Sequence, residues 1–180
     1  MGYNRKDSFY KKAKLAGYRS RAAYKLEELD RRAQLFPGGW LQYAAQKVGK
    51  QGRVVGIDRL EMEPLAELKQ VQILLGDITD VASLKQLQEL LGGPADLVLS
   101  DMAPDTSGVG FADHVRSIEL VRLAFEACLQ LLRPGGTFVA KVFEGPELEE
   151  LVVSIKLRFG KLRRIKPEAT RKGSRELYLV

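Results

Sequence analysis

The chain has few of the residues from which a disulfide framework or a metal centre could be built. Its 180 residues include one cysteine, Cys128, and one histidine, His114. One thiol cannot form an internal disulfide, and these two side chains cannot supply the ligands of a zinc site. We expect Cys128 to lie in a helix core and His114 to lie at the surface or at the start of a helix. The sequence therefore predicts a protein without a bound metal.

Long hydrophobic runs are also missing. The longest apolar stretches are far too short to cross a bilayer, and residues 1–14 contain no apolar segment of the kind found in secretory signals. Hydrophobic residues nevertheless make up 45% of the chain, enough for one substantial core at this length. We expect a cytoplasmic protein without membrane partners, in which residues 1–180 form a single domain and residues 1–18 form a basic N-terminal arm.

The positive charge is concentrated at the two ends of the chain. Residues 1–25 carry eight Lys and Arg against one acid, and residues 156–180 carry nine against two. Residues 26–155 have twelve basic and twenty acidic side chains. This separation indicates that a polyanion binds the ends, although basic tails that are only solvated remain an alternative. Aromatic residues interleave with the N-terminal charges and favour RNA, whose unpaired bases stack on rings: Tyr3, Phe9, Tyr10, Tyr18 and Tyr24.

Apolar periodicity alternates between helix and strand along most of the chain. Helical spacing and capping residues predict helices at residues 21–35, 40–48, 80–91, 113–132 and 146–159. Runs of apolar residues predict strands at residues 53–58, 71–77, 95–101, 136–143, 162–165 and 176–180. The alternation predicts an α/β, Rossmann-like fold, a mostly parallel central sheet with helices on both faces. Ligands bind at the carboxyl ends of the strands in such sheets.

Three predicted strands end in aspartate, at Asp58, Asp77 and Asp101. Because the carboxyl ends of parallel strands share one edge, we expect these acids to line the binding crevice. Asp58 is placed to bind ribose hydroxyls, Asp77 to accept a hydrogen bond from an adenine amine, and Asp101 to lie near the reactive part of the ligand. Each could instead cap a helix or form a turn.

A lysine interrupts the apolar strand at residues 136–143. Burial of Lys141 costs energy unless a charge answers it, and Asp101 and Glu176 lie at the ends of neighbouring predicted strands. A buried amine can act as a general base, and Lys25 is a second candidate cation for the same site. A structural ion pair is the alternative interpretation.

At these residues the sequence resembles the RrmJ/FtsJ family of ribosomal RNA 2′-O-methyltransferases. The matching segments are Tyr18-Arg19-Ser20-Arg21-Ala22 with Lys25, Pro37-Gly38-Gly39-Trp40, Ser100-Asp101-Met102-Ala103-Pro104, Pro134-Gly135-Gly136, Val139-Ala140-Lys141-Val142-Phe143 and Ser174-Arg175-Glu176. The resemblance implies methyl transfer from S-adenosylmethionine to a uridine ribose of large-subunit ribosomal RNA, within the large ribosomal subunit. S-adenosylhomocysteine is the implied product, and no metal takes part.

The resemblance also implies roles for particular residues. A catalytic tetrad falls on Lys25, Asp101, Lys141 and Glu176, with Lys141 as the general base. Contacts with S-adenosylmethionine fall on a second set of residues, namely Gly38, Trp40, Asp58, Asp77 and Asp101.

The chain departs from the family pattern at one point. In the family a strand and a glycine-rich loop that cradles the methionine part of the cofactor precede the Pro-Gly-Gly-Trp turn. Here Phe36 runs directly into Pro37. A sheet without its first central strand would leave backbone groups unpaired, so we expect that about a dozen residues are omitted between positions 36 and 37.

Other functions remain open. If the deletion is real, the chain is a catalytically inactive relative that binds RNA or the ribosome, and a methyltransferase acting on another RNA is also an alternative. A nicotinamide-dependent oxidoreductase on a similar sheet is disfavoured, because the sequence has no G-x-G-x-x-G fingerprint.

Overall fold

The computed structural model describes the chain from residue 41 onward with few gaps. The described residues are 11, 12, 15, 16, 25, 28, 29, 41–62, 65, 67–105, 107, 109–168, 170 and 173–180. Gly38, Trp40, the junction of residues 36 and 37, most of the basic arm and most of the helix expected at residues 21–35 lie outside them. The chain divides into two compact units. The first comprises Met1–Gly56, Glu63–Ile73 and Pro167–Lys172, and the second comprises Ile57–Met62, Leu74–Lys166 and Gly173–Val180.

In the first unit, helix α3 (Leu41–Val48) follows the predicted bounds. It ends at Gly49, whose φ of 71° lies in the left-handed region that glycine adopts without strain. The helix buries Ala44 and Ala45, and the side chain of Gln70 donates a hydrogen bond of 2.9 Å to the Ala45 carbonyl.

Strands β1 (Val54–Asp58) and β2 (Val71–Leu75) pair with each other in a two-stranded sheet. Backbone hydrogen bonds of 2.9 Å close the pair at both ends, from Val54 to Gln70 and from Gly76 to Asp58. Both strands were predicted from their apolar runs.

A second sheet contains four strands in the order β3-β4-β6-β5. They are β3 (Ala95–Ser100), β4 (Leu132–Phe143), β5 (Arg164–Ile165) and β6 (Glu176–Leu179). Strand β4 runs parallel to β3, as expected, whereas β6 pairs antiparallel with both β4 and β5. Among the described residues, β3 forms one edge of this sheet.

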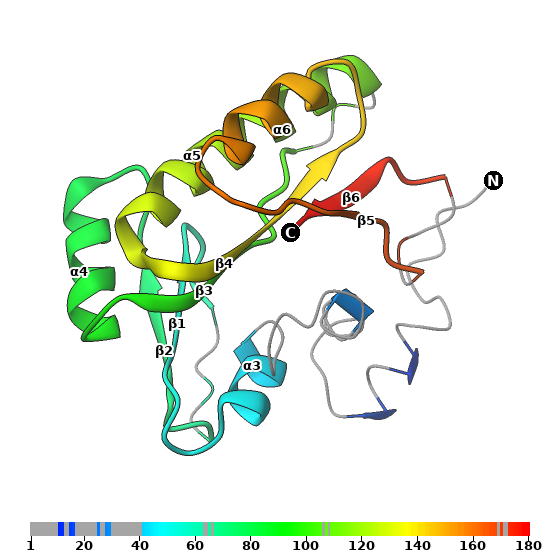
Figure 1. Ribbon diagram of the computed structural model, residues 1–180. Coiled ribbons are helices and arrows are strands. Elements are labelled where there is room, and N and C mark those ends of the chain that lie inside the picture. The colour runs from blue at the N-terminus through cyan, green and yellow to red at the C-terminus, as the bar shows by residue number, and fades with distance from the viewer. Residues whose placement is uncertain are drawn as a thin grey trace. The chain divides into compact units, whose positions relative to one another are not determined.

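The second unit also contains helices α4 (Val81–Leu91), α5 (Gly110–Leu131) and α6 (Leu148–Lys156). Helices α5 and α6 lie along the same side of β4 (Figure 1). Their apolar faces bury Val121, Phe125, Cys128 and Leu151 with Val142 of β4. Cys128 is 0% exposed, so its predicted place in a helix core is confirmed.

Several predicted boundaries were wrong. Helix α5 begins at Gly110 rather than at residue 113, and Asp113 lies in its first turn, where it accepts hydrogen bonds from Ser107. Strand β4 begins at Leu132 rather than at residue 136, because Leu132 pairs with Ala95. Helix α6 spans Leu148–Lys156 rather than residues 146–159.

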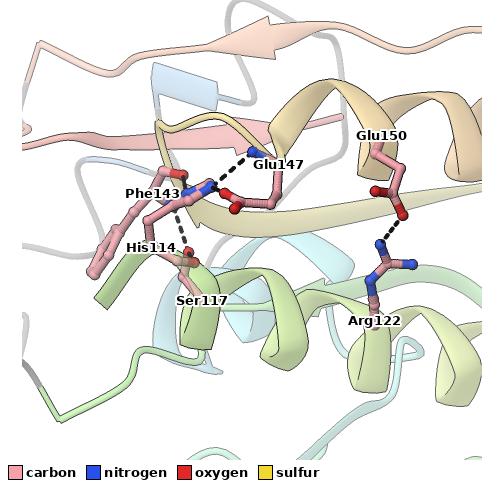
Figure 2. A network of polar contacts seen from close by, with 6 residues as sticks. All are labelled: His114, Ser117, Arg122, Phe143, Glu147 and Glu150. Atoms are coloured by element: carbon pink, nitrogen blue, oxygen red, sulfur yellow. Dashed lines mark hydrogen bonds and ion pairs between the residues drawn. The ribbon is translucent and has the colours of Figure 1, made fainter. Parts of the chain in front are cut away.

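His114 was expected at the surface or at the start of a helix. The start of a helix is confirmed, because His114 is the fifth residue of α5, whereas the surface position was wrong, because the residue is 0% exposed. Its imidazole lies between the end of β4 and the start of α6 (Figure 2). Nδ1 lies 2.7 Å from the Phe143 carbonyl oxygen, and Nε2 lies 2.6 Å from Oε2 of Glu147. These partners are 29 and 33 residues away along the chain, so the sequence pattern could not reveal them.

Within the described ranges, no helix is both long enough and apolar enough to cross a membrane. The same residues contain no group of three or more His, Cys, Asp and Glu side chains that could hold a metal ion.

Candidate active site

Lys141 lies in the middle of the second sheet. Its strand, β4, is flanked by β3 on one side and β6 on the other, and its neighbours Ala140 and Val142 are fully buried. The lysine itself is 8% exposed. A cation in such a place is stable only when charged or polar groups compensate for its lost hydration.

Asp101 provides that compensation. It follows directly after β3, whose Ser100 is opposite Ala140 in the parallel pairing. The ammonium of Lys141 donates to the Asp101 carbonyl oxygen at 2.6 Å and lies 3.0 Å from the carboxylate atom Oδ1. The structure thus brings together two of the four residues proposed as catalytic and fixes the direction of the amine.

Tyr178 completes this cluster and was missed by the sequence analysis. It is opposite Lys141 in the β4–β6 pairing, is 0% exposed, and donates a hydrogen bond of 2.8 Å to Oδ1 of Asp101. Burial, followed by the charges of Asp101 and Glu176, raises the pKa of Tyr178 well above its ordinary value of 10.0. The phenol therefore remains a proton donor that holds the carboxylate. Its place two residues after Glu176 on a strand was the signal that could have found it.

Glu176 and Lys25 are the other two residues of the proposed catalytic tetrad. Glu176 begins β6 and is opposite Phe143 in the strand pairing. Its charge helps to raise the pKa of the Tyr178 hydroxyl. Lys25 belongs to the first unit, where it is helical and 8% exposed.

The acids expected to hold a cofactor lie at strand ends. Asp58 ends β1 and is exposed, with its Oδ1 accepting a 2.9 Å hydrogen bond from the backbone of Leu60. Asp77 follows β2, and its Oδ1 accepts hydrogen bonds from the backbone and hydroxyl of Thr79 at 2.9 and 2.7 Å. Those bonds, and more weakly the Arg59 guanidinium 3.5 Å from Oδ2, lower the pKa of Asp77. Asp77 is therefore an ionised acceptor at neutral pH.

Sequence comparison assigns this arrangement to a family. The model of the family described as FtsJ-like methyltransferase matches residues 18–180. The chain belongs to the FtsJ-like methyltransferase family.

Curated relatives share this family's features over nearly the whole chain. A ribosomal RNA large subunit methyltransferase E of Natronomonas pharaonis is 45% identical, with 98% of this chain and 73% of the relative aligned. A protein of the same name from Marinobacter nauticus is 44% identical over 97% of this chain and 89% of its own length. A third, from Methanothrix thermoacetophila, is 41% identical over 192 aligned positions that take in 100% of this chain. Since the chain has 180 residues, 12 of those positions have no counterpart in it.

A solved structure also matches. A Plasmodium falciparum protein described as a ribosomal RNA methyltransferase superposes with a TM-score of 0.76 and is 30% identical, covering 90% of this chain and 96% of the other. The Rossmann-like methyltransferase fold expected from the sequence is thereby confirmed.

FtsJ-like methyltransferases depend in general on S-adenosylmethionine. This cofactor presents ribose hydroxyls, an adenine amine and a methionine ammonium, which are all hydrogen-bond donors, together with a cationic sulfonium. Acidic acceptors at the carboxyl ends of β1, β2 and β3 fit those groups chemically.

Proposed function

We propose that this FtsJ-like protein methylates a ribose 2′-hydroxyl of large-subunit ribosomal RNA, with S-adenosylmethionine as the methyl donor. The observation that carries the proposal is the ion pair between buried Lys141 and partly exposed Asp101 at the carboxyl end of β3. The names of the relatives support ribosomal RNA as the substrate. We further propose that the target is a uridine and that it is methylated within the large subunit.

The chemistry requires positioning and one proton transfer. S-adenosylmethionine supplies an electrophilic methyl group on a sulfonium. The ribose hydroxyl is a very weak acid, so a nearby base would have to accept its proton while the methyl group exchanges its bond to sulfur, left as an uncharged thioether, for a bond to oxygen. Lys141 in its neutral form is that base, and Asp101 then holds the ammonium that results. The Tyr178 hydroxyl keeps Oδ1 of Asp101 in place throughout. Lys25 and Glu176 are proposed, from the family motif, to help orient the hydroxyl.

The cofactor is proposed to contact five residues: Gly38, Trp40, Asp58, Asp77 and Asp101. The acid at the end of β1 would accept from ribose hydroxyls, and the acid after β2 would accept from the adenine amine. The first two residues lie outside the described part of the chain, so their share of the proposal rests on the motif alone.

Replacing the proposed base tests this function. Lys141→Met keeps the length and apolar stem of the side chain but removes the amine. We expect methyl transfer to RNA to fall by at least about 100-fold, the typical contribution of a general base, with S-adenosylmethionine affinity nearly unchanged. Transfer of a radioactive methyl group and calorimetric titration measure the two quantities. Lys156→Met, at an exposed position on α6, is the matched control. Turnover at the wild-type rate in Lys141→Met would remove Lys141 from the mechanism.

We also propose that the natural protein is one domain and contains about a dozen residues between positions 36 and 37 that the printed sequence omits. Two observations support this. Twelve aligned positions have no counterpart in the chain, and the described strands form two separate sheets rather than one. A further strand between β1 and β3 would join them. The intact mass of protein isolated from its source tests the idea, since a value of 20.1 kDa, that of the printed chain, would contradict it.

If the mass equals that value, the inactive RNA-binding relative becomes the better candidate. The same 12 absent positions favour it, because the cofactor loop would then be lost. Titration with S-adenosylmethionine separates the two functions. Saturable heat indicates the methyltransferase, and its absence indicates the inactive relative.

A further inference from the structure

We propose that the Phe111 ring and the Arg175 guanidinium bind an unpaired RNA base that flanks the methylated nucleotide. This inference rests on the proposed function, since it names the substrate contact beside the same active site. Neither residue belongs to the proposed catalytic or cofactor set. The ligand class is single-stranded or loop RNA.

Arg175 and Phe111 are both next to Gly110, the first residue of α5, one in space and the other along the chain. A Cβ at Gly110 would lie 2.6 Å from Nη1 of Arg175, so the guanidinium lies directly over this glycine. Phe111 is the next residue, and its side chain is 60% exposed. Gly110 thus leaves room for the exposed Arg175, and the residue that follows it carries an exposed aromatic ring.

The Arg175 guanidinium forms no ion pair with the described residues of the second unit. Arg122, Arg133 and Arg164 each form an ion pair there, with Glu150, Asp96 and Glu149 respectively. Among the same residues, Arg175 has no ion pair or side-chain hydrogen bond. Its backbone is nevertheless fixed, because its carbonyl accepts a 2.7 Å hydrogen bond from Glu144. A positioned cation without an acidic partner suits an anionic or π-rich ligand.

Both residues are close in sequence to residues of the candidate active site. Phe111 follows the loop that starts at Asp101, and Asp113 anchors that loop by accepting hydrogen bonds of 2.8 Å from the Ser107 backbone and hydroxyl. Arg175 directly precedes Glu176. All of these residues belong to the second compact unit.

The chemistry at Lys141 requires such a contact. Its amine is 8% exposed, and a ribose held in a stacked helix could not approach it. The target nucleotide must therefore leave its stack, and its neighbours lose stacking partners. Proteins replace that lost stacking with aromatic rings and arginine planes. Phe111 and Arg175 offer both groups in the same compact unit as Lys141.

Binding of a labelled RNA tests the inference independently of catalysis. The probe is a fluorescent hairpin whose loop carries unpaired uridines, and the readout is its anisotropy with the full-length protein. We expect Phe111→Ala to weaken binding about tenfold, in the range for loss of one stacked base, and Phe111→Tyr to restore it. Leu157→Ala, at an 81% exposed position after α6, should bind as the wild type does. Arg175→Gln should also weaken binding, by up to about tenfold, whereas Arg158→Gln should not.

The results that overturn the inference are specific. Phe111→Ala with wild-type affinity, or Phe111→Leu binding as tightly as wild type, would exclude stacking on this ring. A defect seen with intact ribosomal subunits but not with the hairpin would make Phe111 a contact for a ribosomal protein instead. Methyl transfer by the wild-type protein, measured in parallel, tests the proposed function separately, because binding of the hairpin does not require turnover.

Discussion

At the scale of single residues, His114 shows how one buried polar side chain can fix a turn. Its Nδ1 faces the Phe143 carbonyl, and its Nε2 faces both the backbone N–H of Glu147 at 3.2 Å and the carboxylate of that residue (Figure 2). Oε2 of Glu147 is buried and makes no hydrogen bond of regular geometry in the described part of the chain. That oxygen lies 2.6 Å from Nε2 of His114. The turn that follows Lys141 is held on α5 by this network.

Gly145→Ala should disrupt that network. A Cβ at Gly145 would lie 2.4 Å from Cγ of His114, and the ring cannot retreat without losing its partners at Phe143 and Glu147. We expect the free energy of unfolding to fall by about 2 kcal/mol, within the usual range for overpacking a core. Gly160→Ala is the matched control, because nothing lies within 4 Å of a Cβ there. Urea denaturation measures both, and equal stabilities would show that the turn relaxes freely.

At the scale of elements, helix α4 could be predicted at both ends because its signals are local. Asp80 accepts a hydrogen bond from the backbone of Ser83 at 3.0 Å, and Gly92 ends the helix with a φ of 67°. Helix α5 could not be placed so well. Its first residue, Gly110, has no side-chain cap before it, and the acid that resembled a cap, Asp113, instead binds the preceding loop through Ser107.

The same distinction applies to the candidate site. Lys141 could be predicted because a lysine interrupts an apolar strand, and Asp101 because it ends another. Tyr178 could not, since a tyrosine in a buried strand is ordinary and its meeting with Asp101 depends on the β4–β6 register. Register arises from pairing between distant segments, and the burial of His114 was missed for the same reason. The sequence revealed the charged residues that were out of place locally and missed those whose partners are distant.

At the scale of the whole molecule, the two sheets are what most needs explanation. Strand β3 is apolar over Leu97–Leu99, a pattern typical of a strand with neighbours on both sides, yet it forms an edge among the described residues. A missing strand would account for this edge and for the aligned positions that lack a counterpart. The edge position of β3 and the unmatched aligned positions therefore both support the proposal that a segment is omitted between positions 36 and 37.

Cys128 should report the unfolding of the whole molecule. It is fully buried in the core between α5 and the second sheet, and burial raises the pKa of its thiol from 9.0 to about 12. Only the thiolate reacts rapidly, so at pH 8 we expect no labelling by a thiol reagent in native protein and complete labelling in urea. Rapid labelling of native protein would contradict the buried position.

The same thiol predicts a pH dependence of stability. In the unfolded chain it loses its proton near pH 9, whereas in the folded protein it keeps the proton up to about pH 12. Because the folded state binds more protons in this window, the thiol's contribution to the free energy of unfolding should be constant below pH 9 and fall as the pH rises from about 9 to about 12. Tyr178, whose pKa is also raised, adds to the fall above pH 10. Cys128→Ala should flatten the slope between pH 9 and 10, where tyrosine contributes least, and urea denaturation at closely spaced pH values would measure it. A variant with the wild-type slope would mean that the thiol is hydrated in the folded core.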